Sequence, residues 1–345
     1  MTAGAPEGEV GRRAAEALRL LVGAGVLGED ARATELVQLE GGWSRQAHVL
    51  TVAGAGDERQ FVVRVKPPGA LLDTDLRQEY EICRLLAQHD VAVPAAHAFE
   101  GEEGNAFGGP YYVMDRVPGS APNVWRRRDR ELLERNWEQG GSLAEDLVDA
   151  LVRIHAVPPE AVARVLPRRD YGAAVGHWAA VQEEMALVRD PVVEDAYAWL
   201  GGREPSPGPP ALVHGDYRIG NCLNRDGRIT AVLDWEISYL GDPIYDLGYI
   251  SLAYEAGKFT RPGSPLLGAV AEREWFLGEY ERRSGRPVDP EAVRTYAVLA
   301  ALMLIAILTT GIRMYADGRT GDVRMAWTRF AIPGLRQDLT ALIDY

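Results

Sequence analysis

The stretch that most constrains this chain is residues 211–236, ALVHGDYRIGNCLNRDGRITAVLDWE. It predicts a short apolar strand, the polar loop His214–Asn221 and then two further strands. The Asp-Gly pair at 226–227 lies between those two strands and is a hairpin signal. Because the hairpin turns the chain back on itself, we expect Asp234 to return close to Asn221, although 13 residues separate them along the chain.

The polar residues of this stretch are of the types that phosphoryl transfer requires. Transfer from a nucleotide needs a carboxylate facing the attacking hydroxyl and Mg²⁺ to neutralise the phosphates. Mg²⁺ takes hard oxygen ligands, of which the protein usually supplies one or two. Asp216 is therefore a candidate catalytic carboxylate, and Asn221 and Asp234 are candidate metal ligands. The alternative is a plain hairpin whose Asp and Asn side chains stabilise turns. Zinc at His214 is disfavoured, because no further His or Cys lies at ligand spacing.

The run HGDYRIGN followed by VLDWE resembles the catalytic and metal-binding motifs of the aminoglycoside phosphotransferase family, which is distantly similar to protein kinases. The resemblance extends from about residue 35 to 330. It implies an α+β, bilobal protein-kinase-like fold, with an antiparallel β-sheet N-lobe and a mainly helical C-lobe. It also implies Mg²⁺ bound by Asn221 and Asp234, ATP or GTP as phosphoryl donor, and Asp216 as the catalytic residue.

The chain is expected to divide near residue 118. Residues 1–117 would form the nucleotide-binding lobe, with the hinge at its end, and residues 118–345 the catalytic and substrate-binding lobe. In the family, the backbone of the hinge contacts the base, which makes Asp115, Arg116 and Val117 candidates here. The sequence does not separate ATP from GTP.

A glycine-containing turn in the first lobe is a candidate for phosphate contacts. Strands are expected on either side of this turn, where backbone N–H groups can approach phosphate oxygens. Gly42 and Ser44 are the candidates in that turn, although an ordinary hairpin explains it equally well.

The run FVVRVK (61–66) predicts a strand with Arg64 and Lys66 on one face. The family usually has a lysine at the position of Arg64, so either Arg64 or Lys66 could pair with the phosphates. Glu79, in a helix expected at 73–89, is the first choice for a carboxylate that fixes this cation, and Glu81 is the second. Two exposed basic residues on an edge strand remain the alternative.

The second lobe is expected to contain helices at 142–155, 171–185 and 192–200, and after the hairpin at about 243–256, 267–284, 290–316 and 322–343. His155 is interpreted as structural. The resemblance implies that Asp242 and Asp246 support the catalytic loop.

Composition excludes some classes of function. The net charge of −13 argues against nonspecific binding to nucleic acid or to anionic membranes. The longest apolar run, residues 296–312, is short for a membrane span and predicts a buried core helix. Two cysteines and no signal-peptide pattern favour a cytoplasmic protein. The oligomeric state is not indicated.

The resemblance implies that the acceptor is a small-molecule hydroxyl and leaves two classes of acceptor open. The first is an antibiotic, namely an aminoglycoside or another hydroxylated natural product such as a nucleoside antibiotic, inactivated to give resistance. The second is a hydroxyacyl-CoA or related hydroxy acid, because VVRVKPPGALL followed by RQEYEICRLL resembles the kinase-type domains fused to some acyl-CoA dehydrogenases. Five arginines between residues 311 and 336 would favour an anionic acceptor if they form one basic surface, and the alternative is that they are spread over solvated helix faces. A third possibility is a non-catalytic nucleotide-binding protein of kinase shape.

Overall fold

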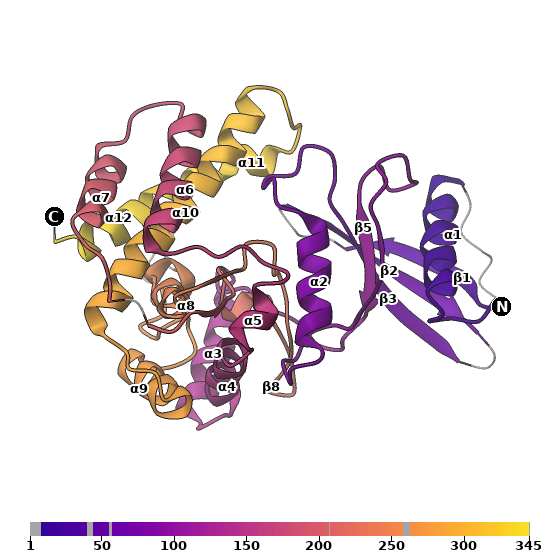
Figure 1. Ribbon diagram of the computed structural model, residues 1–345, viewed down its shortest axis with the longest axis horizontal. Coiled ribbons are helices and arrows are strands. Elements are labelled where there is room, and N and C mark those ends of the chain that lie inside the picture. The colour runs from indigo at the N-terminus through magenta and orange to yellow at the C-terminus, as the bar shows by residue number, and fades with distance from the viewer. Residues whose placement is uncertain (1–7, 40–43, 55–56, 207, 258–262, 345) are drawn as a thin grey trace. The chain divides into compact units, whose positions relative to one another are not determined.

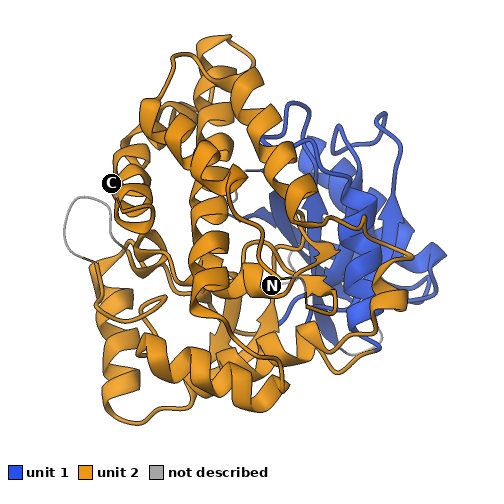
Figure 2. Cartoon of the chain, turned by 60° about the vertical axis from the view of Figure 1, so that its left-hand side comes forward, with its two compact units in different colours: residues 1–88, 93–117 blue, residues 89–92, 118–345 orange. Residues whose placement is uncertain are grey.

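A computed structural model of the chain describes residues 8–39, 44–54, 57–206, 208–257 and 263–344 (Figure 1). It contains two compact units (Figure 2). The first comprises residues 1–88 and 93–117, and the second comprises residues 89–92 and 118–345.

The first unit is built on a five-stranded antiparallel sheet with the strand order β1-β2-β3-β5-β4. Its elements are α1 (Gly8–Gly23), β1 (Arg32–Gln38), β2 (Gln46–Ala53), β3 (Glu58–Val65), α2 (Leu76–Leu86), β4 (Ala96–Glu100) and β5 (Tyr111–Asp115).

Alternation along β3 gives this sheet two buried faces. Phe61, Val63 and Val65 belong to a core cluster that includes the apolar side of α1. Val62 belongs to a second cluster with Tyr80 of α2 and side chains of β5. Because Arg64 alternates with Val63 and Val65, it lies on the face that carries α2.

The second unit is mainly helical and contains two small antiparallel sheets, β6 with β9 and β7 with β8. The first part of this unit comprises α3 (Arg127–Glu138), α4 (Leu143–His155), α5 (Pro159–Val162), α6 (Tyr171–Met185) and α7 (Pro191–Gly201). The central segment comprises β6 (Ala211–Val213), the 3₁₀ turn η1 (Ile219–Asn221), β7 (Cys222–Arg225), β8 (Arg228–Val232) and β9 (Tyr239–Gly241). The last part comprises α8 (Ile244–Ile250), η2 (Ala253–Ala256), α9 (Arg273–Ser284), α10 (Pro290–Ala316), α11 (Val323–Trp327), η3 (Thr328–Phe330) and α12 (Ile332–Leu342).

The apolar run predicted as a core helix forms part of α10. Asp289 caps this helix by accepting from the N–H of Glu291, and Pro290 occupies its first turn, where a missing N–H costs nothing. Among the described residues, only α10 is long and apolar enough to cross a membrane. However, 78% of its most apolar window is buried within the structure, as in the core helix of a soluble protein.

Several element boundaries differ from the sequence-based expectation, each for a local reason. Helix α2 begins at Leu76 rather than at 73, because the Asp75 carboxylate accepts from the N–H of Arg77 and caps the helix there. The helix expected at 322–343 is divided into α11, η3 and α12, and Pro333 lies in the first turn of α12. Helix α3 was not predicted, because it is strongly polar and buries only Leu133.

The helices expected at 243–256 and 267–284 also differ. The first ends at Ile250 and is followed by the separate turn η2. The second begins only at Arg273, because Gly268 and Ala269 adopt positive φ angles that a helix excludes. The antiparallel sheet of the first unit and the helices of the second nevertheless confirm the expected α+β class.

Candidate active site

Asp216 and Asn221 contact each other directly in the loop between β6 and β7. The Asn221 Nδ2 group donates to Asp216 Oδ2 at 2.8 Å and to the Asp216 backbone oxygen at 2.9 Å. The other carboxylate oxygen, Asp216 Oδ1, accepts from Arg218 Nε at 2.9 Å. The Asp216 side chain remains 20% exposed. Because a carboxylate offers about four acceptor positions, this one can still bind a hydroxyl.

His214 joins this loop to the end of β8. Its Nε2 lies 2.9 Å from the backbone oxygen of Leu233, which can only accept, so Nε2 carries the proton. Its Nδ1 is then the acceptor for the backbone N–H of Asp216, at 3.2 Å. The N–H of Leu233 in turn donates to the Asn221 backbone oxygen at 2.8 Å. Leu233 immediately precedes Asp234, so these bonds bring Asp234 back beside the loop that holds Asp216 and Asn221.

The buried carboxylate of Asp246 anchors the start of the loop. It accepts from the backbone N–H groups of His214 and Gly215, at 2.8 and 2.9 Å. It also lies 3.0 Å from Nε2 of His155, whose Nδ1 lies 2.7 Å from the Tyr280 hydroxyl. Burial lowers the pKa of His155, although Asp246 opposes that effect, so the imidazole is neutral and donates from Nε2. His155 thus serves as a structural residue that orients Asp246.

Two residues beside these side chains adopt left-handed backbone conformations. Gly215 has φ +89°, and a Cβ atom at this position would lie 2.8 Å from the backbone oxygen of Ile237. Only glycine satisfies both conditions without strain. Asp234 has φ +72°, which is uncommon for a residue with a side chain. Such strain concentrates at functional positions, and here it falls on a residue that the sequence assigns to metal binding.

The donor set of this loop fits Mg²⁺. The amide nitrogen of Asn221 is committed to Asp216, which leaves Oδ1 as the atom that a cation would meet. Asp234 offers a carboxylate after β8, so both residues supply the hard oxygens that Mg²⁺ requires. Within the described part of the chain, no three His, Cys, Asp or Glu side chains gather as a metal cluster. A site with two protein ligands, completed by phosphates and water, is the arrangement that suits Mg²⁺ rather than zinc.

In the first unit, Glu79 of α2 forms ion pairs with two arginines. Its carboxylate forms an ion pair with Arg64 of β3 through Nε. It forms a second with Arg45, at 3.3 Å, and accepts from the Tyr112 hydroxyl at 3.2 Å. Arg45 also donates to the Thr74 hydroxyl at 2.5 Å. The carboxylate of Glu79 is fully buried, so its charge is balanced by guanidinium groups and not by water.

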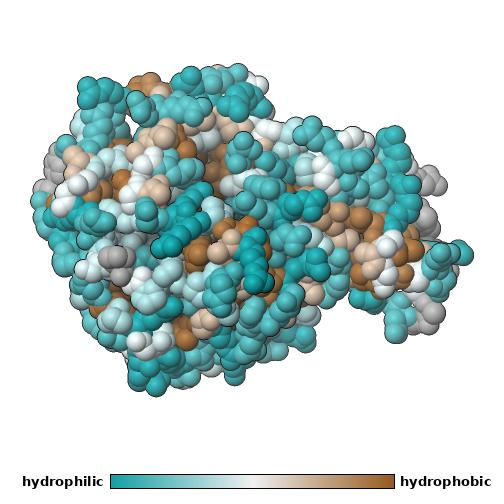
Figure 3. Space-filling model, in the orientation of Figure 1, coloured by the Kyte–Doolittle hydropathy of each residue, from teal (hydrophilic) through white to brown (hydrophobic). Residues whose placement is uncertain are grey.

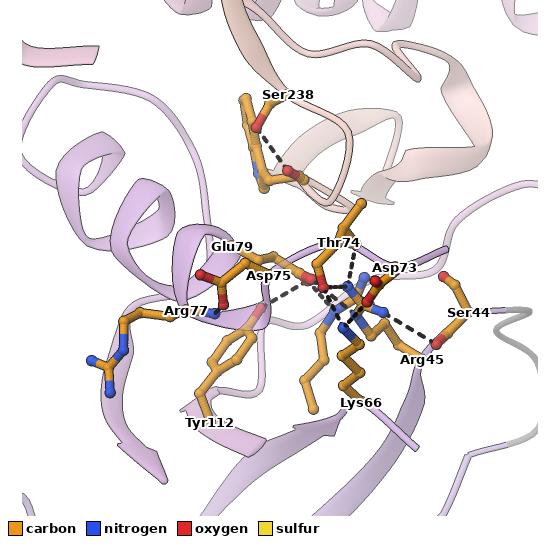
Figure 4. A network of polar contacts seen from close by, with 12 residues as sticks. Ser44, Arg45, Lys66, Asp73, Thr74, Asp75, Arg77, Glu79, Tyr112 and Ser238 are labelled. Atoms are coloured by element: carbon orange, nitrogen blue, oxygen red, sulfur yellow. Dashed lines mark hydrogen bonds and ion pairs between the residues drawn. The ribbon is translucent and has the colours of Figure 1, made fainter. Parts of the chain in front are cut away.

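Lys66 makes different contacts, although the sequence left it as an alternative to Arg64. Its Nζ lies 2.9 Å from Asp73 Oδ1 and 2.9 Å from the Thr74 backbone oxygen (Figure 4). Strand β3 ends at Val65, so Lys66 lies beyond the regular strand. The geometry therefore places Arg64, and not Lys66, at the carboxylate of α2. Glu81, the second choice for that carboxylate, lies 4.0 Å from Arg84.

The remaining candidates of the first unit are Gly42 and Ser44 of the turn and residues 115–117 of the expected hinge. Gly42 lies outside the described residues, whereas Ser44 is buried and its backbone oxygen accepts from Arg45 at 3.4 Å. The N–H of Asp115 donates to Ala95 and that of Arg116 to Gln60, both within this unit. The N–H groups of Asp115 and Arg116 are thus already hydrogen-bonded. A nucleotide base could hydrogen-bond to the N–H of Val117 or to backbone carbonyl oxygens of this segment.

Sequence reasoning missed three charged residues at these sites. Arg45 follows the predicted turn directly, and a guanidinium at the start of a buried strand was the available signal. Arg218 lies inside the quoted motif, two residues after Asp216, and was not singled out. Its second partner, Glu255, is 37 positions away in a predicted helix, where no local pattern connects them.

This chain resembles known proteins in sequence. The family model described as "Phosphotransferase enzyme family" matches residues 35–287. The chain is 31% identical to acyl-CoA dehydrogenase family member 10 from Mus musculus over 232 residues, which is 64% of this chain but only 20% of the mouse protein. This chain thus spans about a fifth of that relative's length.

Solved structures show the same fold. A protein from Ralstonia eutropha, proposed to be an aminoglycoside phosphotransferase, superposes with a TM-score of 0.73 at 23% identity, covering 95% of this chain and 98% of the other. An aminoglycoside phosphotransferase solved with ADP and hygromycin B superposes with a TM-score of 0.56 at 19% identity, covering 93% and 98%. The expected kinase-like fold is thereby confirmed. Together with the matching family model, this shows that the chain belongs to the phosphotransferase enzyme family.

Proposed function

We propose that this phosphotransferase moves the γ-phosphoryl group of ATP or GTP to a hydroxyl of a small molecule, and that Asp216 orients that hydroxyl and receives its proton late in the reaction. The observation that carries the proposal is the carboxylate of Asp216, fixed through both oxygens and still partly exposed. Asn221 and Asp234 would hold Mg²⁺, which neutralises phosphate charge when bound. Arg64 and Ser44 are the proposed phosphate contacts in the first unit, and Glu79 fixes Arg64.

For the acceptor we favour a hydroxyacyl-CoA or related hydroxy acid. The mouse relative is named as an acyl-CoA dehydrogenase family member. The unit that carries Asp216 also exposes an aromatic and basic surface at the end of α11. Trp327 is 65% exposed, its ring lies 5.2 Å from that of Phe330, and Arg329 covers Phe330 at 4.8 Å. Aromatic rings and arginine suit a ligand with an adenine and phosphates.

Residues 311–336, which contain five arginines, are less basic in the structure than the sequence suggests. Three of its five arginines are neutralised by neighbouring acids in the structure. These pairs are Arg313 with Asp317, Arg324 with Asp322 and Arg336 with Asp190. Within the described residues, Arg319 and Arg329 have no ion pair. The acceptor proposal therefore rests on those two arginines and the aromatic pair.

An antibiotic acceptor, inactivated to give resistance, is the second candidate. Hygromycin B is bound in a structural neighbour of 19% identity, and the net charge of −13 suits a cationic aminoglycoside. The cytoplasm, where nucleoside triphosphates are abundant, is the proposed location for either reaction. The intact set of Asp216, Asn221 and Asp234 weighs against a non-catalytic role.

Transfer assays distinguish the two acceptor classes. Wild-type protein would be incubated with Mg²⁺ and γ-labelled ATP or GTP against hydroxyacyl-CoAs, free hydroxy acids, aminoglycosides and nucleoside antibiotics. Label in a hydroxyacyl-CoA, absent from the antibiotics, is the expected result. Label in an antibiotic alone, together with resistance in a sensitive host, would contradict the favoured acceptor and support the second candidate.

Metal binding is tested separately with Asp234→Ala. This variant removes one of the two proposed protein ligands, so Mg²⁺-dependent nucleotide binding should be lost while the fold persists. Titration of nucleotide with and without Mg²⁺, followed by calorimetry, measures this directly. Unchanged Mg²⁺ dependence in the variant would refute the assignment of Asp234.

A further inference from the structure

Arg218 lies between two carboxylates of the second unit. Its Nε is 2.9 Å from Oδ1 of Asp216 and 3.8 Å from Oε2 of Glu255. The side chain of Glu255 is only 3% exposed, whereas that of Arg218 is 28% exposed. The Tyr249 hydroxyl is within hydrogen-bonding reach of both carboxylates. The same Nε atom therefore faces both carboxylates, within hydrogen-bond distance of Asp216 and in a longer ion pair with Glu255.

A glycine provides the space in which this guanidinium lies. A Cβ atom at Gly220 would be 2.2 Å from Arg218 Nη1, far inside contact distance. The backbone of Gly220 is not in the left-handed region, so its conformation does not itself require glycine. What the missing side chain provides is room for Arg218. Alanine at this position would displace the end of a flexible side chain and leave the backbone path open.

Within the described residues, Arg218 is the cation that forms an ion pair with Glu255. Glu255 lies in η2, and Asp338 of α12, whose carboxylate accepts from the backbone N–H of Tyr254, adds a further negative charge nearby. A buried carboxylate is costly unless a cation or hydrogen bonds compensate it. When ionised, Glu255 therefore supplies a second carboxylate that stabilises the position of Arg218.

We infer that Arg218 is a positioning residue for the transfer reaction: held by Glu255 and accommodated by Gly220, it fixes one oxygen of Asp216 while Asn221 fixes the other. This inference rests on the proposed role of Asp216. Holding a carboxylate through both oxygens restricts its rotation, and small misplacements of a reacting group can lower the rate by up to about 100-fold. Substrate binding does not depend on this restriction, so kcat should respond and KM should not.

Gly220→Ala tests the inference without altering any charge. We expect Gly220→Ala and Arg218→Met each to lower kcat by about 10- to 100-fold, with KM for nucleotide and acceptor within about twofold of wild type. Arg218→Lys should recover part of the loss, and Glu255→Gln should lower kcat to a smaller extent. The double variant Gly220→Ala/Arg218→Met should be no slower than Arg218→Met, because both changes remove the same contact. Gly176→Ala, in a helix where a Cβ meets nothing within 4 Å, is the matched control.

Two outcomes separate this inference from the proposed function. Turnover that survives in Asp216→Asn would overturn both. Turnover lost in Asp216→Asn but normal in Gly220→Ala, or losses that multiply in the double variant, would overturn the role of Arg218 alone. A crystal structure of Gly220→Ala gives a readout without turnover. A turned Asp216 carboxylate is expected there, and an unmoved one would contradict the inference.

Discussion

At the scale of single residues, charge pairing distinguishes Arg64 from Lys66, the two candidates for contact with the nucleotide phosphates. Arg64 and Arg45 both contact the buried carboxylate of Glu79, so each guanidinium is held in one place. Lys66 is bound to the exposed Asp73, where solvent weakens the interaction. Arginine can replace the lysine usual in the family because its charge is permanent and its planar group can bind phosphate through two nitrogens.

Arg64→Met should therefore weaken nucleotide binding far more than Lys66→Met. A charge-assisted hydrogen bond to phosphate corresponds to roughly a 10- to 100-fold change in Kd. Lys66→Met is the matched control, and its Kd should stay within about threefold of wild type because Lys66 lies outside the Glu79 cluster. Calorimetric titration with Mg²⁺-ATP measures both. A larger loss in Lys66→Met than in Arg64→Met would reverse the assignment.

At the scale of elements, the catalytic loop is held by its anchors rather than by regular structure. Three hydrogen bonds to Asp246 and the left-handed turn at Gly215 fix its start, and His214 ties it to the end of β8. The loop can keep a defined shape because the three contacts of Asp246 are buried and that of His214 with Leu233 is partly buried.

Gly215→Ala should destabilise this loop and lower turnover. The added Cβ atom would both occupy a left-handed conformation and meet the Ile237 backbone oxygen, so a loss of about 1 to 3 kcal/mol in unfolding free energy is expected. Gly176→Ala lacks both problems and should be neutral or slightly stabilising. Urea unfolding measures the difference, and equal stability of the two variants would contradict this account of the loop.

The same scale shows what could be predicted from the sequence. Helix α6 and strand β6 occupy the residues predicted for them, because apolar patterns and a preceding loop rich in proline and glycine mark them locally. Strand β9 was missed, because three residues carry no periodicity of their own and pairing with β6 defines them. Asp216, Asn221 and Asp234 were identified from a motif, and their catalytic and metal-binding roles stay predictions. The contacts of Arg45 with Glu79 and of Arg218 with Glu255 depend on chain segments that only folding brings together.

At the scale of the whole molecule, most acidic side chains lie on the surface. The face in Figure 3 is largely hydrophilic, in keeping with a chain that is 25% charged. Few carboxylates are buried, and Glu255 is one whose protonation should be visible in the stability of the protein. Burial is the main cause that raises its pKa from 4.5 to about 7, with Arg218 opposing and Asp216 reinforcing that rise.

The pH dependence of unfolding tests this effect. Between pH 4.5 and about 7 the folded protein keeps a proton on Glu255 that the unfolded chain has released, so this group makes the unfolding free energy fall as pH rises. Glu255→Gln cannot titrate. The difference in unfolding free energy, variant minus wild type, should therefore increase by up to about 3 kcal/mol across this range. Parallel stability curves would show that Glu255 is charged throughout.

The most direct test of the central claim compares wild type with Asp216→Asn in one γ-phosphoryl transfer assay, with nucleotide binding measured on the same samples. The substitution keeps the size of the side chain but removes the negative charge that orients the hydroxyl and accepts its proton. The expected result is labelled product with wild type, none with Asp216→Asn, and similar nucleotide affinity in both. Normal transfer by Asp216→Asn would contradict the account, because the carboxylate on which the proposed site is centred would then have no part in the reaction.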